Sequence, residues 1–232
     1  MEKNTVLSIS MSRWETTLGW AYLVAELFLL PDILLLLNRL LPVPLNSAWL
    51  NFVYFSVNFL NIGLIFHRFL ASSLVKAGKQ PGQTLLSALL GFGCYWAASL
   101  ILGYLIPLLI PDFANANDRA IASMAEDGYA AMVIGTVILV PVAEETLYRG
   151  LIFRGLYSRS RAAAYVLSTA FFCAIHVAGF LGAYPPLTLL ACFIQYIPAG
   201  LCLAWAYVRA DTILAPILIH TLINAIGISA MR

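Results

Sequence analysis

Long apolar runs separated by short polar stretches are the dominant pattern along this chain of 232 residues. Each run is about 20 residues long, which is the length that an α-helix needs to cross the hydrocarbon core of a bilayer. Prolines fall in the breaks, at Pro42, Pro44, Pro81, Pro111 and Pro185, where turns are expected. The pattern therefore predicts seven membrane spans, over residues 18–37, 48–70, 84–110, 129–155, 162–181, 186–208 and 212–231.

The composition supports a membrane protein. Hydrophobic residues make up 62% of the chain and charged residues 10%, whereas a soluble domain has roughly 45–50% and 25%. The net charge of +2 and the lack of a basic run argue against a nucleic-acid partner. We expect an all-α, polytopic transmembrane bundle of about seven spans, folded as a single membrane domain over residues 1–232. Residues 1–128 supply the first three spans of that domain, and residues 129–232 supply the last four.

The orientation follows from the distribution of lysine and arginine, which are enriched in cytoplasmic loops. Ten of these residues fall on the side of the N-terminus and three on the other side. This predicts a cytoplasmic N-terminus and an external C-terminus. The polar first 17 residues lack the pattern of a cleaved signal peptide, so we expect the first span to stay as an anchor.

Two adjacent glutamates and an arginine interrupt the fourth apolar run. An ionised side chain at the centre of a membrane helix costs about 3 kcal/mol on insertion scales, so these residues need partners, water or a function. Glu145 and Arg149 are four residues apart and share a helix face, while Glu144 points about 100° away. One carboxylate can thus pair with Arg149 while the other faces a cavity. Pro141 cannot donate to the carbonyl of Val137, which predicts a kink or a loosened turn there.

Two further polar pairs lie in later runs. Phe172 and His176 are one helical turn apart, as are His220 and Asn224. Either pair alone could be interhelical hydrogen bonding, and the glutamates alone could be an interfacial charge cluster. The rise of 1.5 Å per residue, however, places Glu144 and these polar side chains in one layer of the inner half of the bilayer.

A carboxylate, two imidazoles and an amide suit the hydrolysis of an amide bond. Glu144 can take a proton from water, and His176 can hold and polarise that water. His220 and Asn224 can donate to the oxyanion that develops on the carbonyl. The alternative is a metal site with zinc held by Glu144, His176 and His220, although the chain has no His-Glu-x-x-His motif.

At these residues the chain resembles the CPBP family, the intramembrane CAAX-processing and bacteriocin-processing peptidases that are also called Abi proteins. The three motifs of that family are Glu-Glu-x-x-x-Arg, Phe-x-x-x-His and His-x-x-x-Asn. They are matched in order by Glu144, Glu145, Arg149, Phe172, His176, His220 and Asn224.

The resemblance covers residues 129–228 and carries several implications. Glu144 and His176 would activate water, Glu145 and Arg149 would complete the catalytic set, and His220 and Asn224 would form the oxyanion hole. The family also implies a helical bundle whose cavity opens toward the cytoplasm and the inner leaflet. Its catalytic class has been described both as glutamate-type and as metal-dependent, and the sequence leaves zinc as an open alternative.

We therefore expect an intramembrane endopeptidase of a bacterial cytoplasmic membrane, acting on a membrane-associated or prenylated (CAAX-like) peptide. The main alternative is a non-catalytic membrane scaffold or an immunity-type, peptide-binding protein. A small transporter is disfavoured because the chain shows no internal repeat. Glu26, in the middle of the first span, either lines the cavity or is protonated and bonded to Asn58 or Asn61.

Overall fold

The computed structural model describes residues 7–231, and within that range it contains helices and no strand. The helices in chain order are α1 (Arg13–Phe28), α2 (Leu30–Arg39), α3 (Ser47–Ile65), α4 (His67–Lys79), α5 (Pro81–Leu109), α6 (Ala116–Val133), α7 (Val140–Glu145), α8 (Arg154–Tyr157), α9 (Arg161–Ala178), α10 (Pro186–Ala210) and α11 (Leu214–Ala230). Two π-helical stretches, η1 (Ile134–Leu139) and η2 (Thr146–Phe153), join α6, α7 and α8 into one continuous helix.

The described helices have the lengths and composition of membrane spans. Five of them are long and apolar enough to cross a bilayer, and the pair α1 and α2, bent by 49°, would form a sixth. Helix α11 is also apolar but has only 17 residues. The predicted all-α polytopic bundle is thus confirmed. Two of the predicted spans each cover parts of two helices, since residues 18–37 include the break between α1 and α2, and residues 48–70 run past the end of α3 into α4.

The stretch ahead of the fourth span was not predicted. That span was expected to begin at residue 129, and a helical segment does begin there, after a kink at Gly128 where the backbone is not helical (φ −171°, ψ 68°). A further helical segment from Ala116 precedes the kink, so that the whole helix runs from Ala116 to Tyr157. The acidic stretch before residue 129 was interpreted as a loop. Asn115 instead caps a helix there, because its side chain accepts hydrogen bonds from the N–H groups of Asn117 and Asp118.

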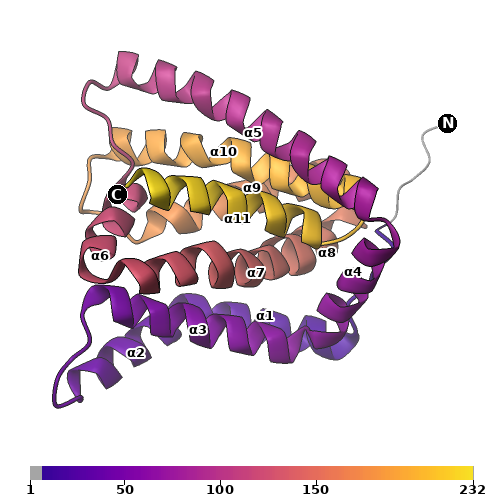
Figure 1. Cartoon of the computed structure of the whole chain (residues 1–232), viewed down its shortest axis with the longest axis horizontal. Coiled ribbons are helices and arrows are strands. Elements are labelled where there is room, and N and C mark those ends of the chain that lie inside the picture. The colour runs from indigo at the N-terminus through magenta and orange to yellow at the C-terminus, as the bar shows by residue number, and fades with distance from the viewer. Residues whose placement is uncertain (1–6, 232) are drawn as a thin grey trace.

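The bundle places α1 and α3 on one side and α5 on the other, with α4 running across one end between them (Figure 1). The continuous helix α6–α8 and the helices α9, α10 and α11 lie between these outer helices (Figure 1). Helix α10 packs against α5 and α9, while α3 packs against α6 and η1. The candidate motifs lie on α7, η2, α9 and α11, and therefore all on helices of the interior.

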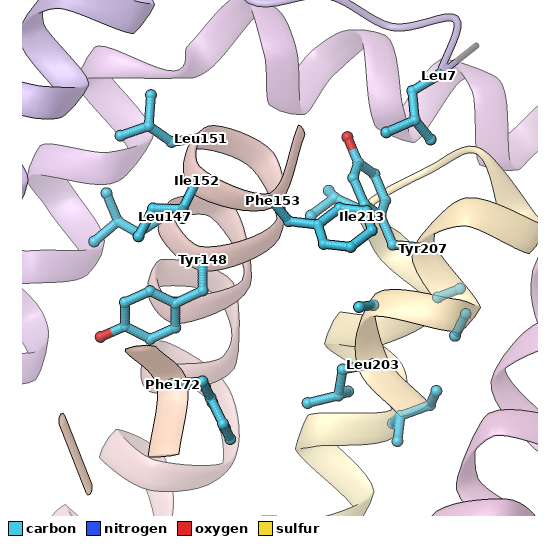
Figure 2. Close-up of a cluster of buried hydrophobic side chains, with 14 of the residues drawn as sticks. Leu7, Leu147, Tyr148, Leu151, Ile152, Phe153, Phe172, Leu203, Tyr207 and Ile213 are labelled. Atoms are coloured by element: carbon cyan, nitrogen blue, oxygen red, sulfur yellow. The ribbon is translucent and has the colours of Figure 1, made fainter. Parts of the chain in front are cut away.

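The stretch η2 is the centre of the apolar core. All eight of its residues are buried, as expected for a helix that is enclosed on every side. Figure 2 shows Leu147 and Leu151 on one side of this stretch and Phe153 on the other. Phe153 meets the rings of Tyr157 at 5.2 Å and Tyr207 at 6.2 Å. Glu145, which directly precedes η2, and Arg149, which lies within it, are both fully buried in this core.

A polar clasp fastens the turn between α10 and α11 to α4. Asp211 adopts a left-handed conformation (φ 50°) that ends α10. Its carboxylate accepts from the backbone N–H of Ser8 at 2.8 Å and from Lys76 at 2.5 Å. The hydroxyl of Thr212 donates to the carbonyl of Ser73 at 2.9 Å. The start of α11, which carries His220, is therefore anchored.

Glu26 does not have the partner that the sequence predicted. Its carboxylate accepts a hydrogen bond of 2.8 Å from the hydroxyl of Tyr54. The hydroxyl of Tyr22 donates to Asn58, and the amide of Asn61 donates to a carbonyl of its own helix. The expected bond of Glu26 to Asn58 or Asn61 is wrong, because a tyrosine one turn before Asn58 reaches the carboxylate instead.

Candidate active site

A pocket of about 570 Å³ is lined by residues of α3, α5, α6, η1, α7, α9, α10 and α11. Glu144, His176, His220 and Asn224 all line it, whereas Glu26 does not. These four residues, predicted from motifs on three separate helices, are thus brought to one cavity.

From these four residues the pocket extends toward the start of α6 and the end of α11. That end of the bundle lies away from α4 (Figure 1). The lysine and arginine count assigns this end to the non-cytoplasmic side. The predicted orientation and the predicted cytoplasmic opening therefore do not fit this pocket together, and each remains a prediction.

Glu145 and Arg149 form a completely buried ion pair, with 3.2 Å between Oε2 and Nε and no exposed side-chain surface on either. The predicted pairing is confirmed. The guanidinium of Arg149 also lies 4.4 Å from the ring centre of Phe172, and its Nη2 donates to the carbonyl of Gly200 at 3.5 Å. Its Nη1 has no hydrogen-bond partner among the described residues. Charge and the aromatic face therefore hold this arginine more than hydrogen bonds do.

His220 lies between the two glutamates. Its Nδ1 is 2.9 Å from Oε1 of Glu145, which can only accept as a carboxylate, so Nδ1 carries the proton and donates. Its Nε2 is 4.0 Å from Oε2 of Glu144, which is too long for a hydrogen bond. The buried pair of Glu145 and Arg149 thus fixes the tautomer of His220 and the orientation of its ring. Its Nε2 faces Glu144, and both residues line the pocket.

His176 is held by its own helix and by two rings. Its Nδ1 donates to the backbone carbonyl of Phe172 at 2.8 Å, which leaves Nε2 as the acceptor of the neutral imidazole. The rings of Phe172 and Tyr196 lie 4.5 Å and 4.3 Å from it, centre to centre. Phe172 in turn lies beside Tyr148 (Figure 2), at 5.9 Å. The imidazole therefore has a fixed position and one free nitrogen.

Asn224 is oriented by a carbonyl that Pro141 leaves without a backbone donor. The Nδ2 of Asn224 donates to the carbonyl of Thr136 at 2.8 Å. Thr136 lies in η1, where the hydrogen-bond ladder runs from residue i+5 to residue i, as in the bond from Val140 to Gly135. The donor for Thr136 would be Pro141, which has no N–H. The loosened turn that the sequence predicted is present, but the carbonyl it frees belongs to Thr136 rather than to Val137.

One comparison with known families matches the part of the chain that carries these residues. Residues 126–226 match the model of the Rce1-like family, described as type II CAAX prenyl endopeptidase Rce1-like. The chain carries an Rce1-like domain. No curated protein and no solved structure matches this chain.

The Rce1-like domain contains all three motifs and reaches from the end of α6 into α11. This family assignment points to a CAAX-type endopeptidase, a hydrolase of peptide bonds. The first 125 residues lie outside the match, although α5 from that part lines the pocket of the Rce1-like domain through Tyr95, Trp96, Ser99 and Leu102.

The side chains of the Rce1-like domain do not assemble a metal site. In the part of the chain that the structure describes, no three His, Cys, Asp or Glu side chains are grouped so that they could hold a metal ion. The zinc set considered from the sequence, Glu144, His176 and His220, is not among such groups, although the bond of Nδ1 of His220 to Glu145 leaves its Nε2 without a proton.

Tyr196 is the residue of the pocket that sequence reasoning missed. It contacts His176 directly, yet it is one aromatic residue in an apolar helix and has no polar partner at helical spacing. Only the packing of α10 against α9 places its ring on the imidazole.

Proposed function

We propose that the protein is an intramembrane endopeptidase that hydrolyses a peptide bond of a membrane-associated or prenylated (CAAX-like) peptide by attack of an activated water. The observation that supports this most is the meeting of Glu144, His176, His220 and Asn224 in a single pocket between apolar helices. The family of the Rce1-like domain supports the same reaction class.

Glu144 is the group best placed to act as the general base. Its side chain is 23% exposed, and its Oε2 has no hydrogen-bond partner among the described residues. It can take a proton from water while the free Nε2 of His176 accepts from the same water and fixes its position. The oxygen then attacks the carbonyl carbon, and Glu144 passes the proton to the departing amine as the C–N bond breaks.

Asn224 and His220 supply the donors for the oxyanion. The amide of Asn224 has two N–H groups; one is bonded to Thr136 and the other is available to the substrate. His220 donates through Nε2 in its protonated form. Donors held in place before the reaction stabilise the developing charge without reorganising, and here the carbonyl of Thr136 and the carboxylate of Glu145 do the holding.

The role of Pro141 leads to a prediction. In a Pro141→Ala variant the new N–H competes with Asn224 for the carbonyl of Thr136. We expect kcat to fall by up to about tenfold, since one hydrogen bond contributes about 0.5–1.5 kcal/mol, with Tm not lowered. The matched control is Pro107→Ala, at an exposed proline inside α5 that does not line the pocket. An equal fall of kcat in both variants would contradict the proposed role.

The proposed function is tested with the purified full chain in nanodiscs and a panel of prenylated and unmodified membrane peptides, with products identified by mass spectrometry. We expect cleavage at one bond that persists in EDTA. His176→Ala is expected to lower the rate by about 10²-fold or more. His67→Ala is the control, because that exposed histidine also contacts a backbone carbonyl, that of Leu64 at the end of α3, but lies outside the pocket.

Each other outcome has a definite meaning. Unchanged cleavage by His176→Ala would refute the site. Loss of cleavage in EDTA with recovery in zinc would return a metal to the reaction. Peptide that binds without being cleaved would favour the scaffold or immunity-type alternative over the peptidase.

A further inference from the structure

The far end of the pocket carries a second polar group that no motif includes. We call it the distal cluster and define it as Tyr95, Asn115, Asp118, Gln195 and Tyr196. All five residues line the pocket. They come from α5, from the start of α6 and from α10.

The distal cluster has a defined internal geometry. The Nδ2 of Asn115 donates to Oε1 of Gln195 at 2.8 Å, and its Oδ1 accepts from the hydroxyl of Tyr196 at 3.4 Å. The same Oδ1 caps α6 by accepting from the backbone N–H of Asp118 at 3.4 Å. Asn115 is buried. These contacts fix the first turn of α6, and with it Asp118, against α10.

Apart from its histidines, the charged residues that line the pocket are acidic. The described residues that line it include two carboxylates, Glu144 and Asp118, and neither lysine nor arginine. Asp118 makes no ion pair with any residue between 7 and 231. Asp118 is an exposed residue of the pocket lining, to which the half-buried Tyr95 and Tyr196 also belong.

A carboxylate in a pocket that two tyrosines also line is suited to a cation. The carboxylate can accept charge-assisted hydrogen bonds, and aromatic ring faces attract a guanidinium or an ammonium. A free peptide carboxylate would meet a like charge here and no described lysine or arginine to pair with, which is unfavourable.

The distal cluster is close enough to the catalytic residues for one peptide to reach both. The ring of Tyr196 lies 4.3 Å from His176, and its hydroxyl at the other end reaches Asn115. One tyrosine thus spans the gap. An extended peptide rises about 3.3 Å per residue, so roughly two to four residues would cover this distance.

We propose that Asp118, in the part of the pocket that Tyr95 and Tyr196 also line, is a specificity subsite for a basic side chain, lysine or arginine, located a few residues from the scissile bond of the substrate. This inference rests on the proposed function in one respect, because the position of the basic side chain is counted from the bond that is cleaved. The charge preference itself can be measured by binding, without turnover.

The experiment uses the full chain in nanodiscs with the Glu144→Gln substitution, so that peptide binds without being cleaved. Fluorescent membrane peptides that carry lysine, glutamine or glutamate at successive positions are titrated, and anisotropy gives Kd. We expect the lysine peptide at one position to bind about tenfold more tightly than the glutamate peptide. Adding Asp118→Asn is expected to remove that ratio, and Asp118→Lys to reverse it.

The matched control is Asp112→Asn. Asp112 is exposed, lies outside the pocket and has a left-handed backbone (φ 58°) that asparagine also adopts. The control is expected to keep the wild-type ratio. A parallel cleavage assay without Glu144→Gln separates the two proposals. Charge-selective binding without cleavage would refute the peptidase and keep the subsite, whereas equal or absent binding of the lysine and glutamate peptides would overturn the subsite.

Discussion

The Glu144→Gln variant is expected to lose about 10²- to 10⁴-fold in kcat, the contribution typical of a general base, with Tm close to that of the wild type. Glutamine keeps the size of the side chain but cannot take the proton from water. The fold should tolerate the change because Oε2 of Glu144 has no hydrogen-bond partner among the described residues. Peptide cleavage followed by mass spectrometry and thermal unfolding of the same preparation measure the two quantities.

Glu126→Gln is the control for this variant. Glu126 is exposed, lies at the start of the Rce1-like domain and does not line the pocket, so kcat should not change. A Glu144→Gln protein that cleaves at the wild-type rate would remove Glu144 from the chemistry. A large fall in Tm together with kcat would assign it a structural role instead.

The second large effect concerns stability. Arg149→Met leaves the carboxylate of Glu145 buried, with only His220 as a polar partner. Breaking a buried pair in this way typically costs about 3–5 kcal/mol. We therefore expect a loss of this order in the free energy of unfolding, measured by denaturant titration in detergent micelles. The double variant Glu145→Gln/Arg149→Met removes both charges, so its loss should be smaller than the sum of the two single losses.

Arg119→Met provides the comparison, since Arg119 is exposed near the start of α6 and its replacement should change the free energy of unfolding by less than about 0.5 kcal/mol. Additive losses in the double variant would show that Glu145 and Arg149 are not energetically coupled, despite the 3.2 Å between them.

The parts of the fold that could be predicted are those set by composition and periodicity. Apolar length identified the spans, and spacing of four residues identified the ion pair of Glu145 and Arg149. The sequence could also bring Glu144, His176, His220 and Asn224 to one layer, because charged and polar groups in apolar helices must find partners. Their catalytic roles remain predictions.

Other features depend on three-dimensional packing and could not be predicted. The ring of Tyr196 reaches His176 only because α10 packs on α9. Glu26 is bonded to Tyr54 rather than to an asparagine because the packing of α1 against α3 brings the tyrosine hydroxyl within hydrogen-bonding distance of the carboxylate. The start of α6 was missed because the cap of Asn115 outweighs the polar composition that follows it.

The two π-helical stretches have a consequence for how the pocket tolerates changes in chain length. Helix α7 has only six residues between η1 and η2, and Glu144 and Glu145 sit at its end. A π turn bonds i to i+5, so it accommodates a residue more than an α turn does. Deleting one residue from η1 would let that turn revert to α-helix while the residues after it keep their direction. Deleting one residue from α7 ahead of Glu144 would instead turn everything after it by about 100° and take Glu144 out of the pocket. A change of one residue in chain length is therefore expected to be tolerated in η1 and not in α7.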